Sequence, residues 1–275
     1  PRSTPLYSSA ASDVYKRQNF LNPDAFRGNF RQAAIDVFYL AWFVQTGLEV
    51  PAEVAPDGVA VRFDPDRVLF VGHSHGGVAG TLMLPLEPSI QGAILSGAGG
   101  GLSLSILYRK DYLDFEQLFR TVLQMPESDP LDAFHPVMAL VQTLVEVTDP
   151  LNYTPLFIHR PPDGRARNVL FTEGLQDTST LPMTSEAAAA AGRLPPLEPL
   201  GRHIAALELQ GVLPIETPAM HNVVGPDGSP ATAALLQLPD GSHSAIFRDY
   251  LAASMYADFL ETLSIDGRGV LRFPQ

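Results

Sequence analysis

One serine stands in a setting that can do nucleophilic chemistry. Ser74 lies in Gly72-His73-Ser74-His75-Gly76-Gly77, which fits the pattern Gly-x-Ser-x-Gly. The pattern follows the short apolar run Val68–Val71 and leads into a predicted helix at about 76–84. A strand, a sharp turn and a helix in that order place a serine hydroxyl at an exposed, strained position. We expect glycine at the flanking positions because a Cβ would collide with the neighbouring strand and helix, and we take Ser74 as the candidate nucleophile.

A serine hydroxyl needs a histidine to take its proton and a carboxylate to fix the tautomer of that histidine. Asp177 lies in the loop after the apolar run Val169–Phe171, and His243 lies in the loop after the run Ala233–Leu238. Groups at the carboxyl ends of parallel strands meet at one edge of a sheet. The sequence therefore predicts a triad of Ser74, Asp177 and His243.

Other residues compete for the roles of base and acid. His221 is the rival base, but it precedes a turn (225–228) instead of following a strand. Glu173 is the rival acid, although it stands nearer the end of its strand than expected. Asp240 is more typical of a turn-shaping residue before His243.

The remaining candidates fit structural roles better. His73 and His75 flank Ser74 too closely along the backbone to reach its hydroxyl easily, so we expect them to pack or to line the site. Their spacing also differs from the i, i+4 spacing of two zinc-binding histidines on a helix. His135 and Asp149 fall in a segment that we interpret as an insertion.

The elements that must position these residues follow an α/β order. Apolar runs typical of buried parallel strands alternate with helical patterns, as in βα units. Residues 98–166 are too long for one crossover helix, so we interpret them as a helical cap whose apolar side chains pack on the main domain or face a ligand. The predicted strands are 68–71, 93–95, 169–171 and 233–238, and the predicted helices are 29–45, 76–84, 113–123, 137–147, 184–192 and 245–263.

Composition excludes several classes of function. The 275 residues carry a formal charge of −12, which disfavours nucleic acid as a partner. The chain has no cysteine, hence no disulfide, thiolate nucleophile or cysteine metal site. No apolar run reaches the roughly 18 residues of a membrane span. The glycine run 97–101 lacks the Gly-Lys-Ser/Thr of a phosphate loop, so we expect neither cofactor nor metal.

Residues 1–18 are polar and lack the apolar stretch of a signal peptide. They resemble translated sequencing-adapter sequence, so we expect them to be non-native or disordered. The predicted catalytic domain then spans residues 19–275, and a signal peptide or anchor would have preceded it.

With these residues in place, the chain from 19 to about 263 resembles the α/β-hydrolase superfamily, and within it bacterial extracellular lipases and esterases. The resemblance implies a mostly parallel sheet with helices on both faces and a cap. It also implies ester hydrolysis by Ser74, Asp177 and His243, an oxyanion donor in the backbone N–H of His75, and an extracellular or periplasmic location. The segments that carry it are 29–36, 64–67, 71–77, 135–137, 149–153 and 174–182.

Two departures from that superfamily keep other functions open. Ser242 makes the sequence before His243 one residue longer than the Asp-Gly-His of many relatives. The early strands and the loop of the second oxyanion donor would lie upstream of the first helix, so the chain is expected to lack them. A small-molecule or lipid ester is the expected substrate. The alternatives are acyl transfer, polyester or amide hydrolysis, or an idle fragment that only binds; the oligomeric state is left open.

Overall fold

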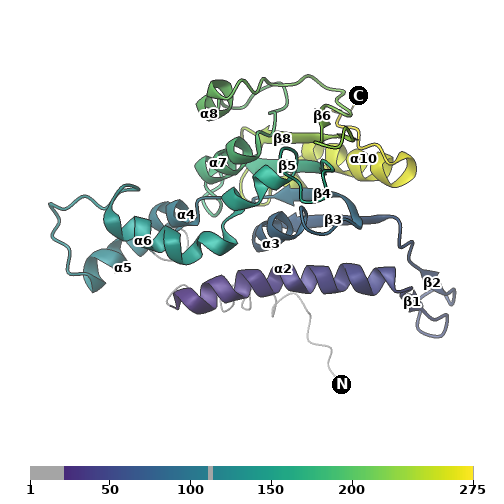
Figure 1. Ribbon diagram of the computed structural model, residues 1–275, viewed down its shortest axis with the longest axis horizontal. Helices are drawn as coiled ribbons and strands as arrows, with labels where there is room; N and C mark the ends of the chain where they lie inside the picture. Colours follow the sequence, from purple (N-terminus) through teal and green to yellow (C-terminus); the bar gives the residue numbers. More distant parts are fainter. Residues whose placement is uncertain (1–21, 111–113, 275) are drawn as a thin grey trace.

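The computed structural model describes residues 22–110 and 114–274, and its centre is a parallel sheet. The sheet has the order β3-β4-β5-β8, and all three pairings are parallel (Figure 1). Its strands are β3 (Val68–His73), β4 (Ile90–Ser96), β5 (Asn168–Gly174) and β8 (Ala233–Leu238). All four predicted strands are therefore present, and the predicted α/β class is confirmed.

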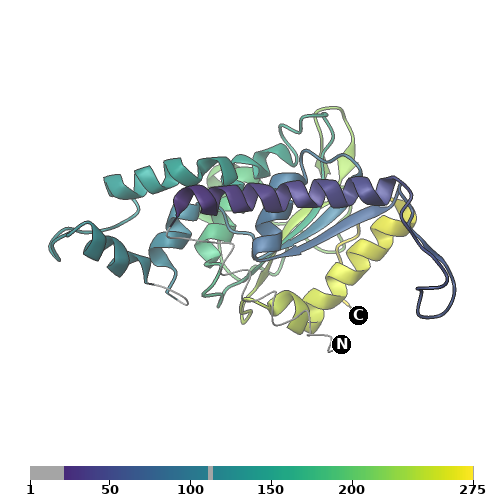
Figure 2. The same cartoon turned by 90° about the horizontal axis from the view of Figure 1, so that it is seen from below.

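Side chains of the strands alternate between two apolar cores, as the pleat of a sheet requires. On β5, Val169 and Phe171 join the core that also contains α2 (Pro23–Gln45), α3 (His75–Met83) and α7 (Pro182–Gly192). The residue between them, Leu170, joins the other core, together with α10 (Tyr250–Asp266). Figure 2 shows the sheet between α2 and α10. Helices on both faces explain why the strands read as apolar runs instead of alternating sequences.

The long segment between β4 and β5 is mostly helical and projects from the sheet (Figures 1 and 2). Some of its apolar side chains are buried, including Leu107 and Met138, whereas Leu140 and Val122 are exposed. Leu107 and Met138 belong to a small core of the segment itself, whereas Leu102 and Val145 join the core of the main domain. Packing on the main domain thus accounts for only part of the apolar surface of this segment. Its helices are α4 (Leu102–Tyr108), α5 (Phe115–Val122) and α6 (Pro136–Val145), followed by the 3-10 turns η1 (Glu146–Thr148), η2 (Pro150–Asn152) and η3 (Thr154–Leu156).

A buried carboxylate fixes the start of this segment. Asp149 accepts hydrogen bonds from the backbone N–H groups of Gly101 (2.8 Å) and Leu102 (2.7 Å), which open α4. The Leu151 N–H and the Gln142 side chain also donate to it, at 3.0 and 2.8 Å. Four donors compensate the burial of this charge, so the Asp149 carboxylate sets the position of α4.

Short elements complete the described chain. A two-stranded antiparallel pair follows α2, and a second pair precedes β8. These elements are β1 (Glu49–Val50), β2 (Val61–Arg62), α8 (Ala205–Leu209), β6 (Val223–Val224), β7 (Pro230–Ala231) and α9 (Ala245–Arg248).

Helix boundaries differ from the sequence prediction where capping residues decide them. The first helix begins at Pro23, with Asn22 capping it through a hydrogen bond from the Ala25 N–H. The predicted helix 245–263 is two helices, because Asp249 is extended and caps α10. Proline favours the first turn of a helix, and Pro182 starts α7 earlier than predicted. Residues 1–18 lie outside the described residues.

The turn between β3 and α3 holds Ser74 in an unusual conformation, with φ 56° and ψ −120°. A Cβ on Gly72 would lie 2.4 Å from the Gly76 carbonyl oxygen, and one on Gly77 would lie 2.7 Å from the Ser96 oxygen. Nothing lies within 4 Å of the corresponding position on Gly76. We expected a Cβ to collide with the neighbouring strand and helix at both glycines of Gly-x-Ser-x-Gly. This is correct for Gly72 and wrong for Gly76. The second close approach is at Gly77, one residue later.

One acid lies inside the sheet. Glu173 on β5 is buried and accepts a hydrogen bond of 2.9 Å from the Gln237 side chain on β8. Burial raises the pKa of Glu173 to about 8 because it disfavours the charged form, while the Gln237 hydrogen bond acts in the opposite direction. Glu186 and Asp177 also raise this pKa, and Arg202 lowers it. Glu173 therefore holds a proton at neutral pH.

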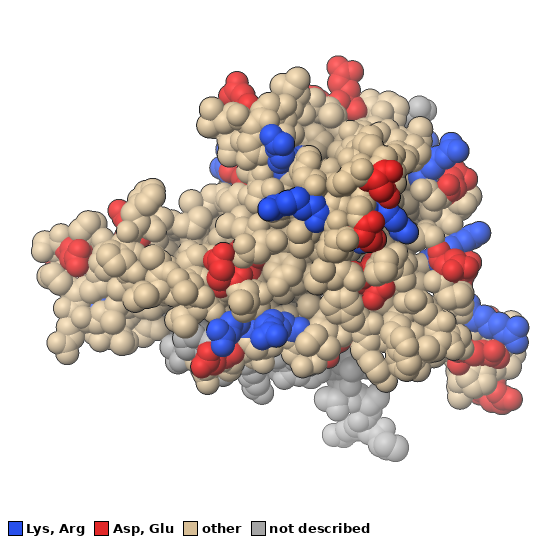
Figure 3. Space-filling view, viewed as in Figure 1, with Lys and Arg blue, Asp and Glu red and all other residues tan. Residues whose placement is uncertain are grey.

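On the face shown in Figure 3, acidic and basic side chains are interspersed over a mostly uncharged surface.

Among helices in the described ranges, none combines the length and hydropathy needed to cross a bilayer.

We expect Gly72→Ala to lower the free energy of unfolding by about 1–3 kcal/mol, the usual cost of overpacking. Gly76→Ala is the matched control: it should be neutral or slightly stabilising, since alanine favours helices and its Cβ meets nothing. Urea denaturation of both variants measures the difference. Equal losses would contradict the close approach at Gly72.

We expect the wild-type protein to lose stability as pH rises from about 4.5 to about 8, because the folded state keeps a proton on Glu173 that the unfolded chain releases. Glu173→Gln has no proton to lose, so its decline over this range should be smaller, by on the order of 1–4 kcal/mol. Urea denaturation at several pH values measures this. The exposed Glu53→Gln should follow wild type, and parallel curves for all three proteins would refute the assignment.

Candidate active site

Hydrogen bonds to both carboxylate oxygens fix the orientation of the buried Asp177 side chain. Its Oδ1 accepts hydrogen bonds from the backbone N–H groups of Ser179 (2.8 Å) and Thr180 (2.9 Å). Its Oδ2 lies 2.8 Å from His243 Nδ1. The loop after β5 turns back on the carboxylate, so the side chain has one position in which all three donors reach it.

His243 lies in the loop between β8 and α9, more exposed than its partner. Its side chain is 28% exposed, against 3% for Asp177. A carboxylate only accepts hydrogen bonds, so Nδ1 donates and the second ring nitrogen, Nε2, is left with the lone pair that a general base needs. The extra residue Ser242 therefore does not keep the imidazole from Asp177.

Ser74 lies at the same end of the sheet, but it follows β3, the strand at the opposite edge from β8. Its N–H donates to the Ser96 carbonyl at the end of β4 (2.8 Å), which brings it beside Gly97. Gly97 in turn lies beside the imidazole, since a Cβ added there would be 3.5 Å from His243 Cε1. No hydrogen bond joins Ser74 Oγ to His243 within the described residues. Catalytic hydrogen bonds are often loose in ligand-free sites and tighten with substrate.

The two histidines beside Ser74 face different surroundings. The His73 ring lies beside that of His243, tilted by 47° with ring centroids 4.7 Å apart, and its Nδ1 lies 3.1 Å from Ser96 Oγ. Burial, and then the nearby His243, lower the pKa of His73, with Asp177 opposing them. His75 instead packs against Phe30 and lines the pocket in front of Ser74. As the first residue of α3, His75 contributes its N–H to the helix amino end.

The rival base and the rival acid are held elsewhere. The His221 N–H donates to Thr232, which precedes β8, so His221 lies at the amino ends of the strands. Six strand residues, about 20 Å, separate that end from the loop of His243. Glu173 accepts a hydrogen bond from Gln237, and within residues 22–110 and 114–274 it has none with a histidine.

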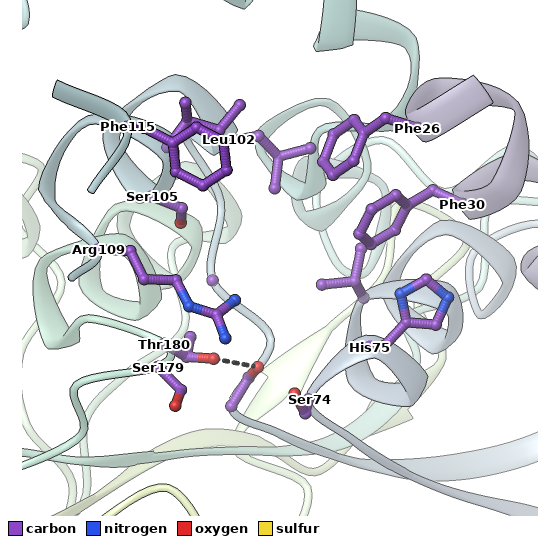
Figure 4. A pocket seen from close by; sticks show the side chains of 14 residues that line it. Phe26, Phe30, Ser74, His75, Leu102, Ser105, Arg109, Phe115, Ser179 and Thr180 are labelled. Atoms are coloured by element: carbon purple, nitrogen blue, oxygen red, sulfur yellow. Dashed lines mark hydrogen bonds between the residues drawn. The ribbon is translucent and has the colours of Figure 1, made fainter. Parts of the chain in front are cut away.

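A pocket of about 550 Å³, its open mouth included, has Ser74 at its base (Figure 4). Aromatic rings of Phe26 and Phe30 from α2 line one side, in an edge-to-face pair with centroids 4.8 Å apart. Arg109 and Thr180 face them from the opposite side. Sequence patterns did not identify these lining residues, because each comes from an element whose position depends on tertiary packing.

The apolar side continues into a second pocket of about 420 Å³, its opening included, under the projecting segment. Phe26, Ile106 and Phe115 line both pockets, so the two spaces adjoin. Its lining is entirely apolar, and it includes Phe119, Val141, Leu144 and Val145 from α5 and α6.

Within the described ranges, no three histidine, aspartate or glutamate side chains lie where together they could hold a metal ion. The arrangement present is a strained serine, a histidine bound to a buried carboxylate, and a helix amino end, all beside one pocket. These are the groups that nucleophilic acyl chemistry uses.

Neither a protein-family model nor a curated protein matches this sequence. Several solved structures resemble it. Acylaminoacyl peptidase of Pyrococcus horikoshii has a TM-score of 0.41 at 12% identity, over 73% of this chain and 24% of that one. Acetyl xylan esterase 1 of Thermoanaerobacterium sp. JW/SL YS485 has a TM-score of 0.44 at 15% identity, over 84% and 52%.

The esterase Pf2001 of Pyrococcus furiosus has a TM-score of 0.39 at 11% identity, over 84% of this chain and 60% of that one. The chain thus spans about a quarter to three fifths of the length of these proteins. Similarity at this level concerns the arrangement of helices and strands alone. The three proteins are described as one peptidase and two esterases.

Proposed function

We propose that this chain is a serine hydrolase that cleaves carboxylic esters through an acyl-enzyme intermediate. The observation that carries the proposal is the 2.8 Å hydrogen bond between His243 Nδ1 and Asp177, beside the strained turn of Ser74. A buried carboxylate that holds a solvent-accessible imidazole in one tautomer is the arrangement that activates a serine hydroxyl.

In the first half of the reaction, Ser74 Oγ attacks the ester carbonyl carbon while its proton passes to His243 Nε2. The carbonyl oxygen becomes an oxyanion, which the N–H of His75 at the amino end of α3 stabilises. The bond to the alcohol then breaks, and His243 returns the proton to the departing alcohol oxygen. The acyl group remains on Ser74.

In the second half, water attacks the acyl carbon and gives its proton to His243. The bond to Ser74 breaks, the proton returns to Ser74 Oγ, and the acid leaves. One ester and one water become one acid and one alcohol. Asp177 keeps its charge throughout and stabilises the imidazolium in both halves.

We further propose that the acyl part of the substrate is apolar and lipid-like. Its support is the second pocket, which adjoins the space in front of Ser74 and is lined by apolar side chains from α2, α4, α5 and α6. Burying each methylene of an acyl chain there contributes about 0.8 kcal/mol.

A fluorophosphonate probe, which phosphonylates activated serines, should label the wild-type protein and should not label Ser74→Ala. Ser96→Ala is the matched control, because Ser96 lies one strand away and contacts His73 instead of the pocket. Mass spectrometry of the labelled peptide locates the modified serine. Equal labelling of wild type and Ser74→Ala would refute the role of Ser74.

Asp177→Asn should lower kcat for a short-chain ester by about 10⁴-fold with little change in folding, because an amide favours the wrong tautomer of His243. Glu173→Gln, the matched change at the rival acid, should keep kcat within about threefold of wild type, since Glu173 is already protonated at neutral pH. Steady-state hydrolysis kinetics and circular dichroism measure the two effects. Similar losses in both variants would contradict the assignment of the acid.

A further inference from the structure

His73, the residue before Ser74, contacts the imidazole of His243. It is the last residue of β3, and its side chain is half-buried. The two imidazole rings are tilted by 47°, and their centroids lie 4.7 Å apart. Within residues 22–110 and 114–274, this is the ring contact that His243 makes. His73 is therefore the aromatic neighbour of the proposed base.

Two further contacts hold the His73 ring in place. His73 pairs with Ser96 in the parallel register of β3 and β4, and its Nδ1 lies 3.1 Å from Ser96 Oγ. Phe247 packs against the same ring at an interplanar angle of 77°, with centroids 5.1 Å apart. Edge-to-face pairs at this separation are favourable. Because Phe247 belongs to α9, the helix that follows His243, the His73 ring contacts both the base and the helix after it.

Asp177 alone does not fix the direction of His243 Nε2. The 2.8 Å hydrogen bond to Nδ1 is one constraint on a side chain with two rotatable bonds. Gly97, which lies beside His243 Cε1, has no side chain to limit rotation of the imidazole. The ring of His73 limits it, because the imidazole cannot turn into space that His73 occupies. A rotation would misdirect Nε2 and break the bond to Asp177, so both depend on the His73 ring.

His73 is also suited to lie beside a base that gains a charge. Burial and then His243 lower the pKa of His73, and Asp177 opposes them with a smaller effect. His73 is therefore neutral at neutral pH. A second cation at this distance would repel the imidazolium that the reaction forms on His243, whereas a neutral ring does not.

We propose that His73 is a positioning residue whose ring directs His243 Nε2 toward Ser74. The proposal rests on the function proposed above. His73 is not among the described residues that line the pocket of Ser74, so it acts through His243 and not through the substrate. The ring carries this role and the hydrogen bond to Ser96 does not, since burial and Phe247 also hold the ring.

His73→Asn and His73→Phe separate the ring from its hydrogen bond. Asparagine keeps a polar group near Ser96 Oγ but removes the ring, whereas phenylalanine keeps a ring but removes the hydrogen bond. His221→Asn is the matched control, because it removes a half-buried imidazole near the amino ends of the strands. Asparagine tolerates the positive φ of 52° at that position.

His73→Asn should lower kcat for a short-chain ester by about 10- to 100-fold and change KM less than about threefold, because a misplaced Nε2 slows proton transfer while the pocket is intact. His73→Phe should keep kcat within about fivefold of wild type, and His221→Asn within about twofold. Circular dichroism checks folding, and His73→Ala replaces His73→Asn if the latter is unfolded. A kcat loss below 10-fold without the ring, or an equal loss in His73→Phe, would overturn the proposal.

Nuclear magnetic resonance of protein labelled with ¹⁵N-histidine tests the positioning without turnover. At about pH 8, where an ordinary histidine is neutral, the spectrum shows which ring nitrogen carries the proton. The signals of His243 are those missing from His243→Gln. Wild type and His73→Phe should contain the Nδ1–H tautomer that Asp177 favours, and its fraction should fall about twofold or more in His73→Asn. An unchanged fraction, or a wild type without this tautomer, would overturn the proposal.

The two measurements separate the role of His73 from the proposed hydrolysis. If wild type cleaves no ester, the hydrolysis fails, and the tautomer fractions still decide the role of His73. If wild type and His73→Asn cleave esters equally well, the hydrolysis stands and the role of His73 fails.

Discussion

The close approach of β3, α3 and β4 at Ser74 is the constraint on which the site depends. Ser74 adopts a positive φ, which residues other than glycine rarely do. Gly72 and Gly77 allow the backbone of α3 to approach both strands. The same turn directs the amino end of α3 at the pocket and sets Ser74 beside Gly97. The strain is local, and the packed helix and strands on either side maintain it.

Two buried carboxylates position loops around this turn in the same physical way. Asp177 gathers two backbone N–H groups and an imidazole, and Asp149 gathers three backbone N–H groups and an amide. In each case the donors compensate the burial of the charge, and the carboxylate determines where the chain turns. One such loop carries the proposed acid, and the other begins the segment that covers the pocket.

The four strands and the proposed triad could be predicted because their signals are local. Each apolar run is followed by turn residues, and parallel strands bring these turns to one edge. The contacts of Asp149 and the place of Arg109 in the pocket could not be predicted in this way. Asp149 contacts residues 47 and 48 positions away in the sequence, and those contacts hold the start of α4, the helix that Arg109 ends. The need for glycine at Gly77 instead of Gly76 likewise depends on how closely α3 approaches β4.

The parallel sheet also determines when such a site can exist during folding. Asp177 and His243 are 66 residues apart, and they meet only after β8 has paired with β5. Pairing of parallel strands requires long loops to close. The chain loses conformational entropy on closure before the new contacts stabilise it, so topologies of this kind fold slowly. A chain that has formed its helices but has not yet docked β8 contains all the site residues and no site. The recovery of site chemistry on refolding therefore reports the late, long-range steps of assembly.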